Sequence, residues 1–271
     1  MKVWVDGQRR RTVDVHDRGL QYGDGLFETM CVQDGVVRLL DLHLERLGSG
    51  LTRLGIKAPI GTLGREIRTA IVAVRQATLK LIVTRGSGER GYRPRGDECA
   101  RRILMLGPAP PAAFPGAVRL RMCRTRLASG SPLAGLKTLG RLESVLARAE
   151  WRSARIFDGL MCDSEGHIVC GTMTNLFLRR GRTLYTPALD RCGVAGVMRR
   201  WILREAPAVV GKVQEARIVW RDLAAAEEVF VSNALIGVQP VQAIEWRQAG
   251  HSLKFDDFES AGRLARRLAA L

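Results

Sequence analysis

One lysine is notable for its surroundings. Lys137 lies in the segment SPLAGLKTLGRLESVLARAE, an apolar stretch that leads directly into an amphipathic helical pattern. A lysine in a low-dielectric pocket has a depressed pKa, and its neutral amine is the usual Schiff-base nucleophile of enzymes. The alternative is an ordinary solvated lysine, and the segment alone does not separate the two readings.

A glycine-rich segment is a second candidate. Gly86, Gly88 and Gly91 form a G-x-G-x-x-G pattern after the apolar run LKLIVTR. A dinucleotide-binding fingerprint must open a helix, but here YRPRGDE follows, with Pro94 and no apolar periodicity. We therefore interpret the segment as an Arg-rich loop. Three of its side chains have guanidinium groups suited to carboxylates: Arg85, Arg90 and Arg93.

A metal site is a third possibility. Cys162, His167 and Cys170 lie close together in the sequence, but their spacing matches no common zinc module and offers no obvious fourth ligand. Buried cysteines of a β-hairpin are the better interpretation, and we predict no metal.

The whole chain has the composition of a folded protein. Its 271 residues suit one large domain or two modest ones, with 46% hydrophobic and 26% charged residues. No apolar run reaches the roughly 18 residues of a membrane span, and MKVWVDGQRRR lacks the apolar region of a signal peptide. The six cysteines show no paired spacing, so we expect reduced thiols and a cytoplasmic location.

The net charge of +16 raises the question of nucleic acid. The arginines are spread along the whole chain, and only 6% of the residues are aromatic, so no stacking platform is evident. We expect no nucleic-acid partner. The charge reflects either a general arginine bias or attraction for a small anionic substrate.

The first part of the chain predicts hairpins followed by helices. Asp6-Gly7 and Asp34-Gly35 are type I′ turn signals between strand-like flanks. Leucines at helical spacing predict a helix over about 40–54, and a second helix is expected over about 59–76. Two apolar strands, LKLIVT and RRILML, follow.

The segment PAPPAAFPG, residues 108–116, is the best candidate for a linker because four of the ten prolines fall in it. Beyond it we expect a helix over about 139–154 and another near 197–205. The expected strands are AVRLRMC, DGLMCD, HIVCG, NLFLRR, TLYT and EVFVSN. The pattern predicts an α/β or α+β protein with domains 1–107 and 117–271, the second carrying Lys137.

Seven segments, in this order, resemble the aminodeoxychorismate lyase family of fold-type IV pyridoxal-phosphate enzymes, which is related to D-amino-acid and branched-chain aminotransferases. They span about residues 14 to 241. The segments are VHDRGLQYGDGLFETM, LLDLHLERL, VTRGSGERGYRP, LAGLKTLGRLESVLAR, GLMCDSEGHIVCGTMTNLF, LYTPALDRCGVAGVMRR and VFVSNALIGVQPV.

This resemblance implies a homodimer of two-domain chains with pyridoxal 5′-phosphate in the cleft between the domains. Lys137 would form the Schiff base with the cofactor, and Arg46 would clamp its phosphate. The backbone N–H groups of Val197 and Met198 would bind the same phosphate at a helix N-terminus. Asn233 would line the phosphate side.

One position departs from the family pattern. Cys170 stands where the family has a glutamate that pairs with the pyridine nitrogen and keeps the ring protonated. Three alternatives remain open: the ring works partly unprotonated, Cys170 pairs with it as a thiolate, or catalysis has been lost. Gly140, where relatives often carry asparagine, is a second departure.

The resemblance favours a lyase over a transaminase. D-amino-acid transaminases carry tyrosine where this chain has Phe27, and Arg90 and Tyr92 lie in the lyase-like RGSGERGY. Thr29 is assigned to the substrate pocket. The implied reaction converts 4-amino-4-deoxychorismate to 4-aminobenzoate and pyruvate, a carbon–oxygen lyase step of folate synthesis. The alternatives are a D- or branched-chain amino-acid transaminase and a basic binding protein with a degenerate site.

Overall fold

The computed structural model describes residues 1–110 and 116–271, and the chain divides into two compact units. The N-terminal unit comprises Met1–Pro111 and Leu136–Gly140, and the C-terminal unit comprises Ala112–Gly135 and Arg141–Leu271. Residues 111–115 of the predicted linker lie outside the described residues. The segment with Lys137 thus groups with the N-terminal unit, although we expected it in the C-terminal domain.

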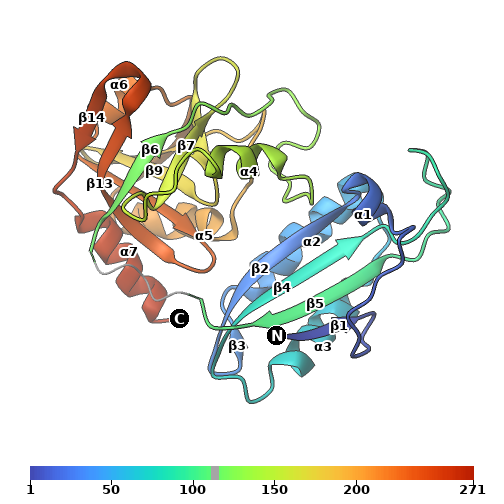
Figure 1. Ribbon diagram of the computed structural model, residues 1–271. Coiled ribbons are helices and arrows are strands. Elements are labelled where there is room, and N and C mark those ends of the chain that lie inside the picture. Colours follow the sequence, from blue (N-terminus) through green and yellow to red (C-terminus); the bar gives the residue numbers. More distant parts are fainter. Residues whose placement is uncertain (111–115) are drawn as a thin grey trace. The chain divides into compact units, whose positions relative to one another are not determined.

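The N-terminal unit is built on a five-stranded antiparallel sheet in the order β1-β5-β4-β2-β3 (Figure 1). Its strands are β1 (Lys2–Val5), β2 (Gly25–Gln33), β3 (Val36–Val37), β4 (Gln76–Thr84) and β5 (Arg101–Gly107). Both predicted turns are confirmed, because Asp6-Gly7 and Asp34-Gly35 adopt positive φ angles of 53°, 79°, 48° and 76° in turn. The strand patterns LKLIVT and RRILML correspond to β4 and β5.

Two helices cover one face of this sheet: α2 (Leu40–Leu54) and α3 (Ile60–Ile71) (Figure 1). Leu47, Leu51, Leu63 and Ile67 pack against the buried residues of β2 and β4. A short helix, α1 (Arg18–Tyr22), begins at Asp17, whose side chain accepts a hydrogen bond from the Gly19 N–H. The sheet residues that alternate with the core point to the opposite face.

The second predicted helix was too long. We expected it to reach residue 76, but α3 ends at Ile71. Ala73 has a φ of 59°, a left-handed conformation that ends the helix, and Gln76 already pairs with Gln33 as the first residue of β4. Sheet pairing therefore overrides the helical pattern at this end.

The C-terminal unit contains a nine-stranded mixed sheet in the order β11-β10-β9-β12-β13-β6-β7-β8, with β14 paired to β13 (Figure 1). The pairs β6–β13, β6–β7 and β10–β11 are parallel. Its strands are β6 (Val118–Met122), β7 (Asp158–Cys162), β8 (Ile168–Gly171), β9 (Asn175–Arg180), β10 (Thr183–Pro187), β11 (Lys212–Ala216), β12 (Glu228–Asn233), β13 (Gly237–Trp246) and β14 (His251–Lys254).

Short helices accompany this sheet. They are α4 (Leu142–Arg148), α5 (Val197–Glu205), α6 (Trp220–Ala224), α7 (Glu259–Ala269) and the 3₁₀ turns Ala206–Ala208 and Arg247–Ala249. The main apolar core lies on one face of the sheet and includes Leu120, Leu160, Leu176, Val231 and Ile244. The predicted α/β class is confirmed. No helix among the described residues is long and apolar enough to span a membrane.

The predicted helix over 139–154 was also too long, since α4 covers only Leu142–Arg148. At its start, the N–H of Leu139 donates to the Gly25 carbonyl, so this residue is committed to strand-like pairing. After α4, the indole of Trp151 donates to the Ile156 carbonyl and holds a compact loop. Both ends of the helical pattern are therefore used for other contacts.

A buried carboxylate ties α7 to the C-terminal sheet. Glu228 on β12 is fully buried, accepts the N–H groups of Ser260 and Ala261 at the start of α7, and pairs with Arg179 at 3.2 Å. Its neighbour Glu227 also pairs with Arg179, but its side chain is 52% exposed.

We predict that Glu228→Ala lowers the free energy of unfolding by about 1–3 kcal/mol, because it leaves the buried N–H groups of Ser260 and Ala261 without an acceptor, while Arg179 keeps Glu227 and Asp257. Glu227→Ala is the matched control and should cost about 1 kcal/mol or less. Urea unfolding of both variants measures the difference. Equal losses would show that α7 does not depend on the buried carboxylate.

Candidate functional site

The segment Leu136–Gly140 is held along β2 by the backbone. The N–H of Phe27 donates to the Lys137 carbonyl at 3.0 Å, and the N–H of Leu139 donates to the Gly25 carbonyl at 3.1 Å. The β3 strand pairs only with Val32 and Gln33, so the first half of β2 has a free edge for this segment. This pairing explains why Lys137 belongs to the N-terminal unit.

The Lys137 side chain lies over an aromatic ring. Its Nζ is 4.3 Å from the centroid of Phe27, and the Nζ of Lys80 is 5.2 Å from the same centroid. Lys80 on β4 is directly opposite Thr29 on β2. These four side chains form a basic and aromatic surface on the face of the sheet away from the helices, which we call the Lys137 face.

Lys80 was missed in the sequence. A signal was present, because the pattern QATLKLIVT places a lysine between two buried leucines, on the side of the strand that does not face the core. A second cation beside Thr29 and Lys137 suits a substrate that carries carboxylates. Of the residues proposed for substrate and cofactor, the structure places Thr29 and Lys137 on this face.

Arg46 is held by a buried carboxylate. Glu28 accepts hydrogen bonds from the Nε of Arg46 at 2.8 Å and from its Nη2, and it contacts the Nδ1 of His43 at 2.6 Å. His43 and Arg46 are three residues apart on α2 and therefore share one face of the helix. Glu28 and His43 were both missed because neither stands out in the sequence.

The electrostatic environment lowers the pKa of both Glu28 and His43, for different reasons. Burial raises the pKa of Glu28, but the Arg46 charge and the hydrogen bonds from His43 and Arg46 outweigh it and hold that pKa below its ordinary value. Burial lowers the pKa of His43, assisted by the charges of Arg46 and Lys137 and opposed by Glu28. His43 is thus neutral at neutral pH and donates from Nδ1, while its buried Nε2 has no partner among the described residues.

The loop with Arg90 and Tyr92 is clamped by a buried arginine. Arg18, 3% exposed, donates to the carbonyls of Gly91 and Tyr92 at 2.9 Å each and pairs with Asp24 at 3.0 Å. The Tyr92 ring itself is 84% exposed. No helix follows the three glycines, which confirms that this segment is not a dinucleotide-binding fingerprint.

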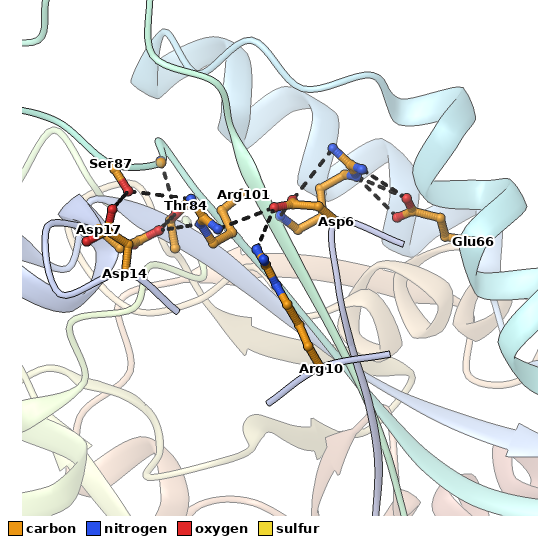
Figure 2. A network of polar contacts seen from close by, with 10 residues as sticks. Asp6, Arg10, Asp14, Asp17, Glu66, Thr84, Ser87 and Arg101 are labelled. Atoms are coloured by element: carbon orange, nitrogen blue, oxygen red, sulfur yellow. Dashed lines mark hydrogen bonds and ion pairs between the residues drawn. The ribbon is translucent and has the colours of Figure 1, made fainter. Parts of the chain in front are cut away.

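A polar network fixes the base of the same loop (Figure 2). Arg101 bridges Asp17, Asp6 and Ser87 at 3.2, 3.4 and 3.4 Å. The Thr84 hydroxyl donates to Asp17 at 2.9 Å. Because Asp17 also caps α1, one carboxylate connects the helix, the strand and the start of the loop. The loop therefore leaves the sheet from a rigid base.

Cys170 lies in the C-terminal unit, on β8, and is buried. It packs in a small apolar cluster with Met161, Val169, Leu189 and Cys192. Burial raises the pKa of its thiol to about 12, and the Asp158 and Cys192 charges act in the same direction while Arg141 opposes them. The thiol is therefore protonated at neutral pH, which argues against the thiolate alternative.

The turn after Cys170 is organised by Asp158. This fully buried carboxyl accepts the hydroxyls of Thr172 and Thr174 at 2.5 and 2.7 Å. Burial raises its pKa, and these hydrogen bonds oppose the rise. A Cβ at Gly171 would lie 2.2 Å from the Asp158 carboxylate oxygen, so glycine is required there.

Val197 and Met198 begin α5, as the phosphate assignment requires. Gly196 precedes the helix with no side-chain cap, which leaves N–H groups at the positive end of the helix dipole. A Cβ at Gly196 would lie 2.0 Å from the Asn175 side-chain oxygen. This helix start has the chemistry of an anion site.

Asn233 has a structural role that the sequence did not indicate. Its side-chain oxygen accepts the N–H groups of Leu235 and Ile236 at 2.9 and 3.0 Å, and its amide donates to the Met173 carbonyl at 3.3 Å. Its side chain thus holds the turn after β12 to the turn after β8.

The hairpin between β7 and β8 brings Asp163, Glu165 and His167 together. Asp163 accepts the N–H groups of Glu165 and His167, as expected for an aspartate that stabilises a tight turn. Glu165 also pairs with Arg191 at 2.5 Å. The hydrogen bonds of the turn therefore explain why Asp163, Glu165 and His167 lie together, and no bound metal is needed to explain it. Cys162 and Cys170, the other members of the zinc set considered above, lie on the two strands of the hairpin.

The proposed site residues therefore divide between the two units. Thr29, Arg46, Arg90, Tyr92 and Lys137 belong to the N-terminal unit. Cys170, Val197, Met198 and Asn233 belong to the C-terminal unit. Each unit thus has an arginine or a helix N-terminus that could bind phosphate, and the N-terminal unit has the amine that a carbonyl cofactor requires.

Residues 25–244 match the model of the class IV amino-transferases, so the chain belongs to this family and has the fold-type IV architecture. It is 36% identical to an aminodeoxychorismate lyase from Vibrio harveyi over 89% of this chain and 90% of that protein. The 4-amino-4-deoxychorismate lyase of Pseudomonas aeruginosa has a similar solved structure, with a TM-score of 0.91, 43% identity and coverage of 99% and 98%. A putative branched-chain-amino-acid aminotransferase of Methanocaldococcus jannaschii is 30% identical over 91% and 89% of the two chains.

We predict that His43 makes folding sensitive to mild acid. Its folded pKa lies below the ordinary 6.5, so the unfolded chain binds the extra proton and stability falls as the pH drops below about 6.5. The contribution of one such group is at most about 1.4 kcal/mol per pH unit. His43→Asn keeps a donor toward Glu28 but cannot titrate, so its stability should depend less on pH between 7 and 5.

Urea unfolding at several pH values measures this slope, with the exposed His16→Asn as the control. The control should follow the unsubstituted protein. Identical slopes for the His43 variant and the unsubstituted protein would refute the assignment.

Proposed function

We propose that this protein is a pyridoxal-phosphate-dependent aminodeoxychorismate lyase, which converts 4-amino-4-deoxychorismate to 4-aminobenzoate and pyruvate. The similarity to two lyases, at 36% and 43% identity over nearly the full length of each chain, carries the proposal. The placement of Lys137 over Phe27, on a face that also has Thr29 and Lys80, supports it with chemistry.

The bound cofactor would supply the carbonyl that captures the substrate amine and an electron sink for the reaction. The Nζ of Lys137 would remove the proton from the amine-bearing ring carbon of the substrate. The electrons of that C–H bond would form the aromatic ring as the C–O bond to the enolpyruvyl group breaks. Lys80 and Arg90 would attract the two substrate carboxylates.

Arg46 and the start of α5 at Val197 and Met198 are the phosphate-binding groups of this proposal. Glu28 orients Arg46 by occupying two of its N–H groups on one edge, so the guanidinium has a fixed plane. We also assign the phosphate side to the turn that Asn233 holds. Each of these groups is held within its own unit: Arg46 by Glu28, and the N–H groups of Val197 and Met198 by the start of α5.

Cys170 supports the lyase over a transaminase. A neutral, buried thiol cannot hold a proton on the pyridine nitrogen as a carboxylate would, so the electron sink is weaker. Formation of an aromatic product supplies much of the driving force of the lyase reaction. Transamination has no such product and would suffer more from the same substitution.

A branched-chain or D-amino-acid transaminase is the second candidate. The 30% identity to a putative branched-chain-amino-acid aminotransferase is the observation that favours it. The lyase remains preferred because the identities to lyases are higher and because Phe27 replaces the tyrosine of D-amino-acid transaminases.

A homodimer in the cytoplasm completes the proposal. Helix α4 buries only Ala147 and exposes Leu142, Val145 and Leu146 at 76%, 60% and 62%. An apolar row of this kind on a short helix is typical of a surface that another subunit covers. The six cysteines all have free thiols, in keeping with a reducing compartment.

We expect the purified protein to release 4-aminobenzoate and pyruvate from 4-amino-4-deoxychorismate. Lys137→Ala should lower the rate at least about a hundredfold, because it removes the general base. Product fluorescence and a coupled pyruvate assay measure the two products. The exposed Lys57→Ala is the control and should retain activity.

Borohydride reduction followed by peptide mass spectrometry tests the lysine independently of turnover. A cofactor label on Lys137 is expected, and a label on another lysine would contradict the assignment. Amino-group transfer from a D- or branched-chain amino acid, without aminobenzoate release, would select the transaminase instead.

The dimer can be tested by mass in solution. Size-exclusion chromatography with light scattering should give twice the chain mass of 29.9 kDa. Leu142→Glu/Leu146→Glu should give 29.9 kDa, because two charges would be buried in the interface. Val36→Glu/Val72→Glu, also at exposed apolar positions, should remain dimeric. A monomeric unsubstituted protein would exclude the homodimer.

A further inference from the structure

A cavity in the C-terminal unit has no role in the proposed reaction. It has a volume of about 390 Å³ and is lined by Arg119, Ser153, Arg155, Ile156 and Glu245. A second hollow of about 260 Å³ shares Ser153, Ile156 and Glu245, so the two adjoin. The second hollow adds Arg121, Glu150, Trp151 and Arg152 to the lining. The larger volume lies within the range of about 300–1,000 Å³ typical of small-molecule sites.

The sheet places two arginines on one side of this cavity. Arg119 and Arg121 are two residues apart on β6, so they point to the same face, and Leu120 between them points into the apolar core. Glu245 on the parallel strand β13 is in register with Arg121. The loop that follows α4 closes the cavity with Ser153 and Arg155.

The charges around the cavity do not balance, because four arginines face two glutamates. Arg119 pairs with Glu245 at 2.7 Å. Arg121 donates to the carbonyls of Met122 and Glu150 and lies 3.6 Å from the Glu150 carboxylate. Arg119 and Arg121 thus have acidic partners.

Arg152 and Arg155 are different. Both are exposed, and neither side chain has a hydrogen-bond or ion-pair partner in the part of the chain that the structure describes. Glu150 cannot neutralise them, because its carboxylate already accepts the N–H groups of Arg124 and Thr125 and the Thr125 hydroxyl. Two positive charges therefore remain for a ligand.

The donors favour a phosphate group. A guanidinium presents two parallel N–H groups that match a phosphate edge, and two unpaired guanidinium groups flank Ser153. The Ser153 hydroxyl accepts the N–H of Arg155 at 3.3 Å, so its own proton is available to a ligand oxygen.

A nucleotide base fits less well. The ring of Trp151 is 6% exposed and already has Arg148 and Arg121 at 4.6 and 5.8 Å from its centroid. No aromatic face of this residue is left for a base to stack on.

We propose that Arg152, Ser153, Arg155 and Arg119 form an anion site on the C-terminal unit that binds the phosphate group of a small molecule. The site is separate from the residues assigned to substrate and cofactor. A phosphate ion or a phosphate monoester bound there would take no part in the reaction.

Isothermal titration of the holoenzyme with inorganic phosphate, at ionic strength held constant with chloride, tests the site. Arg152→Gln/Arg155→Gln should weaken binding at least about tenfold, because it removes the two unpaired cations. Arg221→Gln/Arg266→Gln is the control with the same change in charge at exposed positions outside the cavity, and it should bind as the unsubstituted protein does. Glycerol 3-phosphate in a parallel titration distinguishes a monoester, if it binds more tightly, from free phosphate.

Three outcomes would overturn the proposal. The first is absence of phosphate binding at millimolar concentration. The second is unchanged binding in Arg152→Gln/Arg155→Gln, which would assign the phosphate to another site on the holoenzyme. The third is an equal loss in Arg221→Gln/Arg266→Gln, which would reduce the effect to the net charge of +16.

Discussion

Two backbone hydrogen bonds between β2 and the segment Leu136–Gly140 determine where the reactive amine lies. Because they involve Phe27 and Gly25, they place Lys137 beside the Phe27 ring without any contribution from its own side chain. The close approach also requires Gly25, where a Cβ would lie 2.5 Å from the Val83 carbonyl oxygen. In sequence, the segment lies outside the rest of the N-terminal unit. Its position is therefore set by pairing with the edge of β2 and not by the residues that precede and follow it.

The two faces of β2 divide the work. Glu28 points toward the helices and joins His43 and Arg46, while Phe27 and Thr29 point to the face with Lys80 and Lys137. The alternation of a strand thus separates a buried charge cluster from an open reactive surface by one residue. A shift of register by a single residue would exchange the two sets, and the antiparallel pairing of β2 with β4 over nine residue pairs prevents it.

Much of this could be predicted from the sequence, because local signals agreed with the fold. The Asp-Gly turns, the leucine pattern of α2 and the seven family-like segments all had direct structural counterparts. The helices predicted too long failed for a common reason: residues 72–76, 139–141 and 149–154 extend helical patterns, but the chain uses them for other contacts. Strands β11, β13 and β14 and helices α6 and α7 were not predicted, since β11 is largely exposed and α7 depends on the distant Glu228. The roles of Lys80, Glu28 and His43 could not be predicted, because they arise from contacts among β2, β4 and α2 that form only in the folded chain.

Acidic side chains are the scarce component of this molecule, with 27 of them against 43 lysines and arginines. Single carboxylates accordingly serve several cations: Asp24 holds Arg18 and Arg85, and Asp6 meets three arginines in the network of Figure 2. Replacing Asp24 leaves Arg18 and Arg85 without a carboxylate partner, whereas replacing either arginine leaves Asp24 with the other. Replacing Asp6 removes the partner of Arg10 alone, because Arg101 and Arg102 also pair with Asp17 and Glu66. Tolerance to substitution around Asp24 is therefore asymmetric: either arginine can be replaced at a lower cost in stability than the aspartate that both of them share.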